Sequence, residues 1–336
     1  MRNLLSLFIL LLVVQCNPLK ERPKIAFYYW KTTYELSTKE TSFLKKLEVD
    51  KLYIRLFDVD IDSKTGLAVP VSPIKFAQKV EGFEMIPVIY LKNRLFLDPK
   101  LDLNELVNHI HQFISQIALK HHLQVNEVQF DCDWTLKSRD SFLRFIELYR
   151  AKSGMKLLAT IRLHQVKYRL TTLIPKVDEG VLMYYNMGRI GADSLNSIYD
   201  RKIAKQYINT LNNYRLPLQV ALPIYSWGVH SREGKVVNLV SKVYNRTFEV
   251  DTNFVAMATS QFRTVHPTIK GGTYFKEGDV VKIESISKED LLEMATDLAH
   301  ELPKPPKEII FYDLDTTNLN IYQYDDQLFK EIISRF

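Results

Sequence analysis

The stretch of residues 127–135, EVQFDCDWT, holds two carboxylates two positions apart among apolar and aromatic side chains. Side chains alternate between the two faces of a β-strand, so Asp131, Asp133 and Thr135 would share one face and the apolar residues the other. Carboxylates on an inner face are costly unless they meet water, a partner or a ligand. We therefore predict that this strand forms the floor of a site, with Asp131 and Asp133 as the candidate catalytic residues.

Other strand-like segments also end in acidic and aromatic side chains. The patterns FDVD, FDCD and YDLD each place an aromatic residue before an Asp-x-Asp pair. Acids beside Tyr and Trp suit a carbohydrate, because sugar hydroxyls donate hydrogen bonds to carboxylates while the C–H faces of the sugar stack on rings. The candidate substrate-binding residues are Trp30, Asp58, Arg162, His164, Tyr185, Asn186, Tyr225, Trp227 and Asp313.

Each of these groups also has a structural interpretation. An acid pair can serve as a helix cap, a loop turn or a salt bridge to a nearby arginine, and this interpretation is strongest for Asp58 and Asp313. His164 is either an inward-facing site residue or a satisfied structural donor. The Asp pairs lack the regular ligand loop of a calcium site, so we predict no metal and no other cofactor.

The segments that must position these residues alternate between strand-like and helix-like patterns. The strand-like segments are 25–30, 51–60, 84–91, 127–135, 155–165, 180–188, 217–228 and 308–315. The helix-like segments are 38–47, 74–80, 98–123, 138–152, 201–214, 287–301 and 326–336. No tight hairpin joins consecutive strands and no Gly-rich phosphate turn follows the first, which favours an α/β fold of the (β/α)8 TIM barrel type over an open doubly wound sheet. In such a barrel the site lies at the carboxyl ends of the strands.

The alternating rhythm breaks at residues 229–278, which carry turn signals and β-like runs such as KVVNLV. We predict a β-rich insertion after the seventh strand, over the mouth of the barrel. The predicted organisation is a signal peptide at 1–16, a tether at 17–24 and the barrel at 25–336, which contains the insertion.

The first residues, MRNLLSLFILLLVVQC, carry one Arg and an apolar run that is too short to span a bilayer comfortably and is typical of a signal peptide. Cys16 follows this run as at a bacterial lipoprotein cleavage site, although Gln15 stands where a small residue is usual. An ordinary cleaved signal is the alternative. We predict an exported protein of the cell envelope, anchored to a membrane by a lipid at Cys16. Cys132 is then the only other cysteine, so no intramolecular disulfide forms.

The composition is that of a globular chain, with 336 residues and 46% hydrophobic content. The net charge of +6 comes from basic residues that are spread along the sequence without a Lys/Arg-rich block. We therefore predict no nucleic-acid partner.

Three fragments of the chain resemble family 18 glycoside hydrolases, the chitinase-like proteins. Asp131, Asp133 and Trp134 match the later part of the family's D-x-x-D-x-D-x-E motif, and residues 183–186, MYYN, resemble its Met-x-Tyr-Asp/Asn segment. The seventh strand, ALPIYSWG, resembles the family strand that ends in a small apolar run and Tyr. The chain also resembles a group of bacterial barrel lipoproteins with glycosidase-like folds. The resemblance implies a chitinase-like TIM barrel in which Asp133 and Tyr185 hold the N-acetyl group of a sugar.

The chain departs from the family at two positions of the motif. The family's catalytic Glu is Thr135 here, and its first Asp is Val128. A threonine hydroxyl cannot protonate a glycosidic oxygen near neutral pH, so the family's mechanism does not carry over intact. The other candidate proton donors are Asp131, Asp58 and Asp313, if burial raises their pKa.

Three functions remain open from the sequence. The favoured one is a glycan-binding barrel that lacks the standard catalytic Glu, a possible pseudoenzyme. The second is an active glycoside hydrolase that uses Asp131 and Asp133 with Asp58 or Asp313. The third is a non-catalytic scaffold of an envelope complex that binds a protein partner through the 229–278 insertion.

Overall fold

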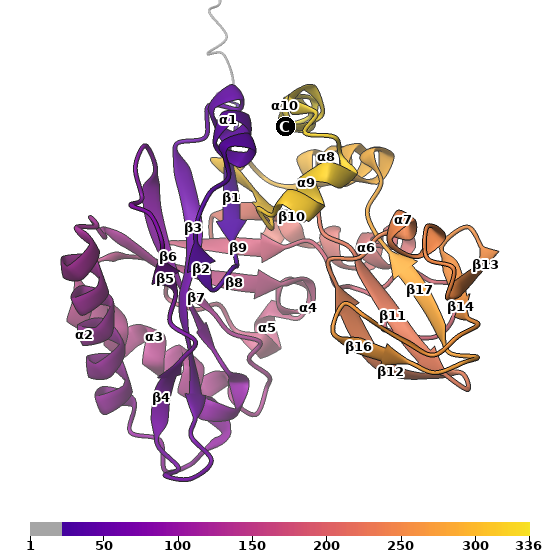
Figure 1. The fold of residues 1–336 in the computed structure, drawn as a ribbon. Coiled ribbons are helices and arrows are strands. Elements are labelled where there is room, and N and C mark those ends of the chain that lie inside the picture. The colour runs from indigo at the N-terminus through magenta and orange to yellow at the C-terminus, as the bar shows by residue number, and fades with distance from the viewer. Residues whose placement is uncertain (1–21) are drawn as a thin grey trace, which may run out of the picture.

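The computed structural model describes residues 22–336 as a closed barrel with an added five-stranded β-sheet and two small two-stranded sheets (Figure 1). The predicted signal peptide, Cys16 and most of the tether lie outside these residues. The barrel strands are β1 (Lys24–Tyr29), β3 (Lys51–Ile61), β6 (Glu84–Leu91), β7 (Glu127–Asp131), β8 (Lys156–Arg162), β9 (Glu179–Met183), β10 (Leu218–Pro223) and β18 (Glu308–Tyr312). Neighbours pair in the order β1-β18-β10-β9-β8-β7-β6-β3, and β1 also pairs with β3, which closes the ring. All of these pairings are parallel, so the predicted (β/α)8 barrel is confirmed.

The helices lie outside the strands, and most of the longer ones begin at a side-chain cap that the sequence supplies. The longer ones are α1 (Thr38–Lys46), α2 (Leu103–His121), α3 (Arg139–Ser153), α6 (Arg201–Ile208), α8 (Lys288–Glu301) and α10 (Asp326–Ser334). Helix α2 begins later than predicted because the Asp102 side chain accepts hydrogen bonds from the backbone N–H groups of Asn104 and Glu105. No helix of the described chain is both long and apolar enough to cross a membrane.

The helix predicted at 74–80 is wrong. Residues Lys75–Phe76 form a short strand, β5, which pairs with β2 (Thr33–Tyr34). The backbone N–H of Lys75 donates to the carbonyl of Thr32, and that of Ala77 donates to the carbonyl of Tyr34. These pairings with a distant segment satisfy the backbone groups that a helix would have paired locally.

The insertion after the seventh barrel strand is an antiparallel sheet, which agrees with the β-rich insertion that the sequence predicts at this place. Its strands are β11 (Trp227–Arg232), β12 (Lys235–Ser241), β13 (Phe254–Ala258), β14 (Gln261–Thr264) and β17 (Val280–Glu284), in the order β12-β11-β17-β14-β13. The sheet extends slightly beyond 229–278, because Trp227 and Glu284 pair at its base. Buried Val and Phe side chains such as Phe248 and Phe262 give the insertion a small core of its own.

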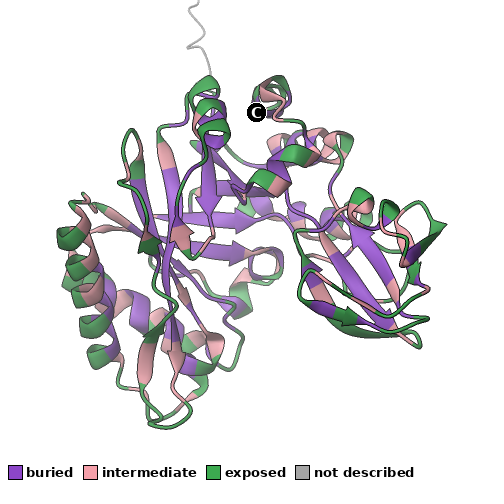
Figure 2. Ribbon diagram, viewed as in Figure 1, coloured by how far each residue is buried: buried purple, intermediate pink, exposed green. Residues whose placement is uncertain are grey.

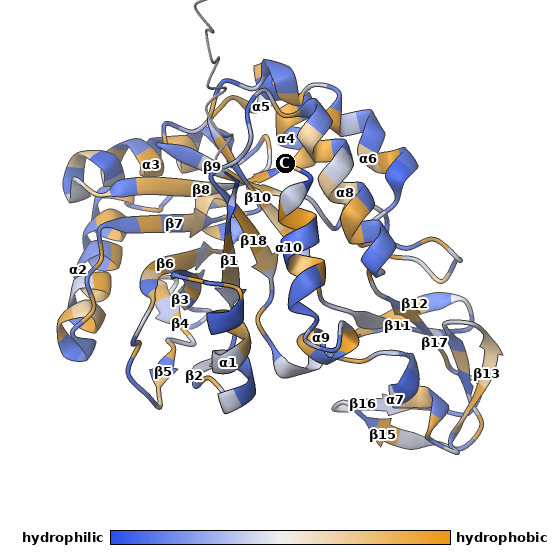
Figure 3. Ribbon diagram, turned by 90° about the horizontal axis from the view of Figure 1, so that it is seen from above, coloured by the Kyte–Doolittle hydropathy of each residue, from blue (hydrophilic) through white to orange (hydrophobic). Residues whose placement is uncertain are grey.

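The barrel core is apolar, and ion pairs lie at the amino-terminal ends of the strands. Figure 2 shows the barrel strands as mostly buried, and Figure 3 shows hydrophobic residues along β7 and β8. At the amino-terminal ends, Lys51 pairs with Glu308 at 2.9 Å and Lys156 pairs with Glu127 at 3.1 Å. The carboxyl ends are therefore the open end of the barrel, where the sequence predicts the site.

Candidate functional site

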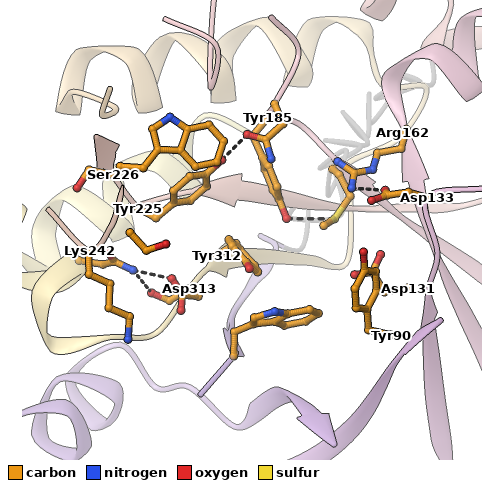
Figure 4. A pocket seen from close by; sticks show the side chains of 16 residues that line it. Tyr90, Asp131, Asp133, Arg162, Tyr185, Tyr225, Ser226, Lys242, Tyr312 and Asp313 are labelled. Atoms are coloured by element: carbon orange, nitrogen blue, oxygen red, sulfur yellow. Dashed lines mark hydrogen bonds and ion pairs between the residues drawn. The ribbon is translucent and has the colours of Figure 1, made fainter. Parts of the chain in front are cut away.

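A cavity of about 400 Å³ opens at the carboxyl ends of the strands and is bordered on one side by the insertion (Figure 4). It brings together side chains from most of the barrel strands. The sequence-predicted residues that line it are Trp30, Asp131, Asp133, Arg162, Tyr185, Asn186, Tyr225, Trp227 and Asp313.

Asp131 is the last residue of β7 and points inward with only 5% of its surface exposed. Its Oδ1 accepts a hydrogen bond of 2.8 Å from the hydroxyl of Thr160 on the neighbouring strand. Burial raises the pKa of Asp131 to about 6, and the nearby charge of Arg162 acts in the opposite direction. Asp131 can therefore exchange a proton near neutral pH.

Asp133 lies beyond the end of β7, which is shorter than the strand predicted at 127–135. Its carboxylate is about half exposed and forms an ion pair with the guanidinium of Arg162 (Figure 4). The apolar residues between and after the two acids, Cys132 and Trp134, are buried. The predicted alternation therefore holds, although the hydrogen-bonded ladder stops at Asp131.

Thr135, at the position of the family's catalytic Glu, is not among the residues that line the cavity. Its backbone N–H donates to Oγ of Ser138 at 2.9 Å, and its own hydroxyl lies 3.3 Å from the same oxygen. Ser138 immediately precedes α3. The hydroxyl of Thr135 thus belongs to the turn that starts this helix.

Aromatic rings form one wall of the cavity, with Tyr312 at their centre. Its ring centroid lies 5.5 Å from those of Trp30 and Tyr185 and 5.6 Å from that of Tyr225. Trp227 continues the wall, 5.4 Å from Tyr225. These offset and edge-on contacts fix the rings in place.

Trp227 and Tyr225 are also held by hydrogen bonds. The indole N–H of Trp227 donates to Oε2 of buried Glu284 at 2.8 Å. The hydroxyl of Tyr225 donates to Oδ1 of Asn186, which follows β9. The base of the insertion therefore positions part of the cavity wall.

Asp313 follows β18 and is 9% exposed. The side-chain amide of Asn318 donates to its Oδ1 at 2.6 Å. Burial raises the pKa of Asp313 to about 6, Asp315 adds to this rise, and Lys242 opposes it. Lys242 itself comes from the insertion and pairs with Asp315 at 2.7 Å.

Two predicted residues lie outside the cavity lining. Asp58 is buried on β3 and forms a salt bridge of 2.7 Å with Arg55, which agrees with the structural interpretation of this acid. His164 was predicted to face inward from a strand reaching residue 165, but β8 ends at Arg162 and helix α4 (Leu163–Lys167) begins there. The side chain of Gln165 accepts from the backbone N–H of Arg162 and stabilises this start, which leaves His164 exposed.

Sequence reasoning missed several lining residues, including Tyr90, Tyr312, Ser241 and Lys242. Tyr90 and Tyr312 stand at the ends of strand-like segments, so the strand-end rule that selected Tyr185 could have found them. Nothing in the sequence near Lys242 indicates that it reaches the barrel. Within residues 22–336, no group of three His, Cys, Asp or Glu side chains is arranged to hold a metal ion.

Comparison with solved structures identifies the architecture. A mutant GH18 chitinase from Cycas revoluta in complex with (GlcNAc)4 superposes with a TM-score of 0.53 at 11% sequence identity, over 93% of this chain and 99% of the other. The chain has the fold of family 18 chitinases. A class V chitinase from Nicotiana tobaccum superposes with a TM-score of 0.53 at 10% identity, over 92% of this chain and 99% of the other. No protein-family model matches the sequence, and no curated protein matches it.

Proposed function

We propose that this chitinase-fold barrel binds a glycan in the cavity at its mouth and does not use the catalytic acid of family 18. The observation that carries the proposal is the cavity itself, in which a wall of packed aromatic rings around Tyr312 stands beside the buried carboxylates of Asp131 and Asp313. Rings accept the apolar faces of sugars, and carboxylates accept hydrogen bonds from their hydroxyls.

The fold neighbours support a carbohydrate over other small molecules. One of the structures with this fold is a chitinase in complex with (GlcNAc)4. A cavity of about 400 Å³ lies within the range of small-molecule sites and suits one or two sugar units. The two lines of support are independent, because one rests on the fold and the other on the lining residues.

Thr135 favours binding over hydrolysis by the family's route. No proton donor stands at that position, and the hydroxyl there contacts Ser138 at the start of α3. Loss of a general acid removes a large part of a glycosidase's rate, whereas stacking and hydrogen bonding to the sugar do not depend on it.

Hydrolysis by other acids is the second candidate function. Burial raises the pKa of both Asp131 and Asp313 to about 6, which is the range of a general acid in a glycosidase. One such acid could protonate the glycosidic oxygen while the other carboxylate acts as base or nucleophile.

A panel of oligosaccharides, assayed for retention on the protein and for release of reducing ends, tests both candidates. We expect retention without release, and we expect Trp30→Ala and Tyr225→Ala to weaken it by about tenfold or more. Tyr168→Ala removes an exposed aromatic ring outside the cavity lining and serves as the matched control.

Release of reducing ends that Asp131→Asn or Asp313→Asn abolishes would establish the hydrolase instead. If the folded protein neither retains an oligosaccharide nor releases reducing ends, both functions are contradicted. That result would leave a scaffold role, with the protein partner bound through the insertion.

The proposal places the barrel in the cell envelope, anchored by a lipid at Cys16. Its support is the sequence pattern of residues 1–16 alone. Metabolic labelling with a radioactive fatty acid tests this lipid anchor. We expect the parent protein to carry the label and Cys16→Ala to abolish it. A parent protein that takes up no label would contradict the anchor.

A further inference from the structure

Acids are frequent at the mouth of the barrel, and most of them are neutralised by a cation of the same chain. The paired acids are Asp58 with Arg55, Asp60 with Arg94, Asp133 with Arg162, and Asp315 with Lys242. Within residues 22–336, Asp131 and Asp313 form no ion pair. These two acids are also the most buried carboxylates of the cavity lining.

Both unpaired acids keep one oxygen for a ligand. Asp131 is 5% exposed, and its Oδ1 accepts from Thr160. Asp313 is 9% exposed, and its Oδ1 accepts from Asn318. The Oδ2 atom of each accepts no hydrogen bond from any side chain or backbone group of the described chain. A buried carboxylate without a counter-charge is costly, so a ligand that brings a positive charge would gain from pairing with it.

The barrel topology sets the two acids on opposite sides of the cavity. Asp131 ends β7 and Asp313 follows β18, and these strands stand four places apart in the ring in either direction. Figure 4 shows Asp131 and Asp313 on either side of Tyr312. Within residues 22–336 no three His, Cys, Asp or Glu side chains are grouped so as to hold a metal ion, whereas an extended organic ligand can meet one or both acids.

The cations near these acids act on their pKa from a distance but form their ion pairs with other acids. Arg162 lines the cavity but forms its ion pair with Asp133, and Lys242 lines it but forms its ion pair with Asp315. The aromatic wall between the two acids adds to the attraction for a cation, because an ammonium group over a ring face is stabilised by the charge distribution of the ring. The cavity therefore combines aromatic faces with an excess of negative charge.

We infer that the cavity selects a glycan of amino sugars whose amino groups are unsubstituted and cationic, with an ammonium group paired to Asp131 or Asp313. This inference rests on the proposed glycan-binding function and specifies its ligand. An N-acetylated sugar would stack on the same rings but would leave both carboxylates without a counter-charge.

Calorimetric titration of the parent protein near neutral pH tests the inference with a glucosamine tetramer, an N-acetylglucosamine tetramer and a cellotetraose. We expect the glucosamine tetramer to bind at least about tenfold more tightly than either neutral oligomer, since charge-assisted contacts are the stronger ones. Asp131→Asn and Asp313→Asn should each weaken binding of the glucosamine tetramer by a larger factor than binding of the neutral oligomers, because the variants lose the ionic pairing in addition to any hydrogen bond from a hydroxyl.

The exposed Asp140 provides a control, because Asp140→Asn removes the same formal charge away from the cavity and should leave all three affinities unchanged. Equal or tighter binding of the N-acetylglucosamine tetramer to the parent would overturn the inference and leave the glycan-binding function standing. If the parent protein binds none of the three oligomers, both the inference and the glycan-binding function are overturned. The comparison among ligands uses the parent alone, so it decides the question even where a buried Asn variant does not fold.

Discussion

Glu284, at the base of the insertion, should be a major determinant of both stability and the cavity wall. It is 2% exposed, accepts from the indole N–H of Trp227 at 2.8 Å and from the backbone N–H of Ser197 at 3.2 Å, and pairs with Lys282 at 2.7 Å. Glu284→Ala leaves an ammonium group, two N–H donors and the hydroxyl of Ser197 without this partner. The affected groups come from three different segments of the chain.

The expected cost follows from those contacts. Removing one partner of a buried ion pair costs about 3–5 kcal/mol, because the remaining charge stays buried. Lys282 keeps the carbonyl of Leu195 at 2.7 Å and the carboxylate of Asp193 at 3.6 Å as partners, so we expect the lower part of this range. Glu284→Gln keeps one side-chain oxygen for Trp227 but replaces the oxygen near Lys282 with an NH2 group and removes the charge, so it should cost less than Glu284→Ala because it keeps the hydrogen bond of Trp227.

Urea unfolding at neutral pH, followed by tryptophan fluorescence, measures these free energies, and titration with the best-bound oligosaccharide measures the effect on the site. Glu249→Ala, on an exposed side chain of the same insertion, is the matched control and should stay within about 0.5 kcal/mol of the parent. A loss below about 1 kcal/mol for Glu284→Ala would refute the argument that a buried network holds the insertion to the barrel. An unchanged affinity in the folded variant would refute the role of Glu284 in positioning Trp227.

Three further predictions test the core and the electrostatics of the cavity. Gly180→Ala should destabilise the protein by about 1–3 kcal/mol in urea unfolding, because the added Cβ would lie 2.8 Å from a side-chain carbon of Leu218, and a neutral result would contradict this tight packing. Burial raises the pKa of Asp131 from 3.8 to about 6. The unfolded chain therefore loses this proton at a lower pH than the folded protein does, and the free energy of unfolding should fall as pH rises from about 4 to 6. Over that window the parent should lose on the order of 3 kcal/mol more than Asp131→Asn, and parallel pH profiles of the two proteins would contradict the shift. Lys242→Met should raise the pKa of Asp313 above about 6 in a carboxyl NMR titration, since the lysine charge lowers it, whereas an unchanged pKa would show that this charge does not reach Asp313.

The barrel and much of its site could be predicted because they depend on local patterns. Alternation of apolar and polar residues identified the strand that carries Asp131, and the absence of tight hairpins indicated parallel pairing. Parallel strands in a closed barrel bring their carboxyl ends together, so Trp30, Asp131, Tyr185 and Tyr225 could be assigned to one site although they lie far apart in sequence. The departure of Thr135 from the family motif was also visible in the sequence alone.

Only the tertiary structure decided which acids are neutralised and where the insertion reaches. The sequence treats Asp58 and Asp313 alike, but Arg55 neutralises the first and no cation of the described chain pairs with the second. Lys242 joins the cavity because the added sheet folds back onto the barrel. The charge state of a buried carboxyl depends on every group packed around it, and those groups come from segments whose proximity no local pattern encodes.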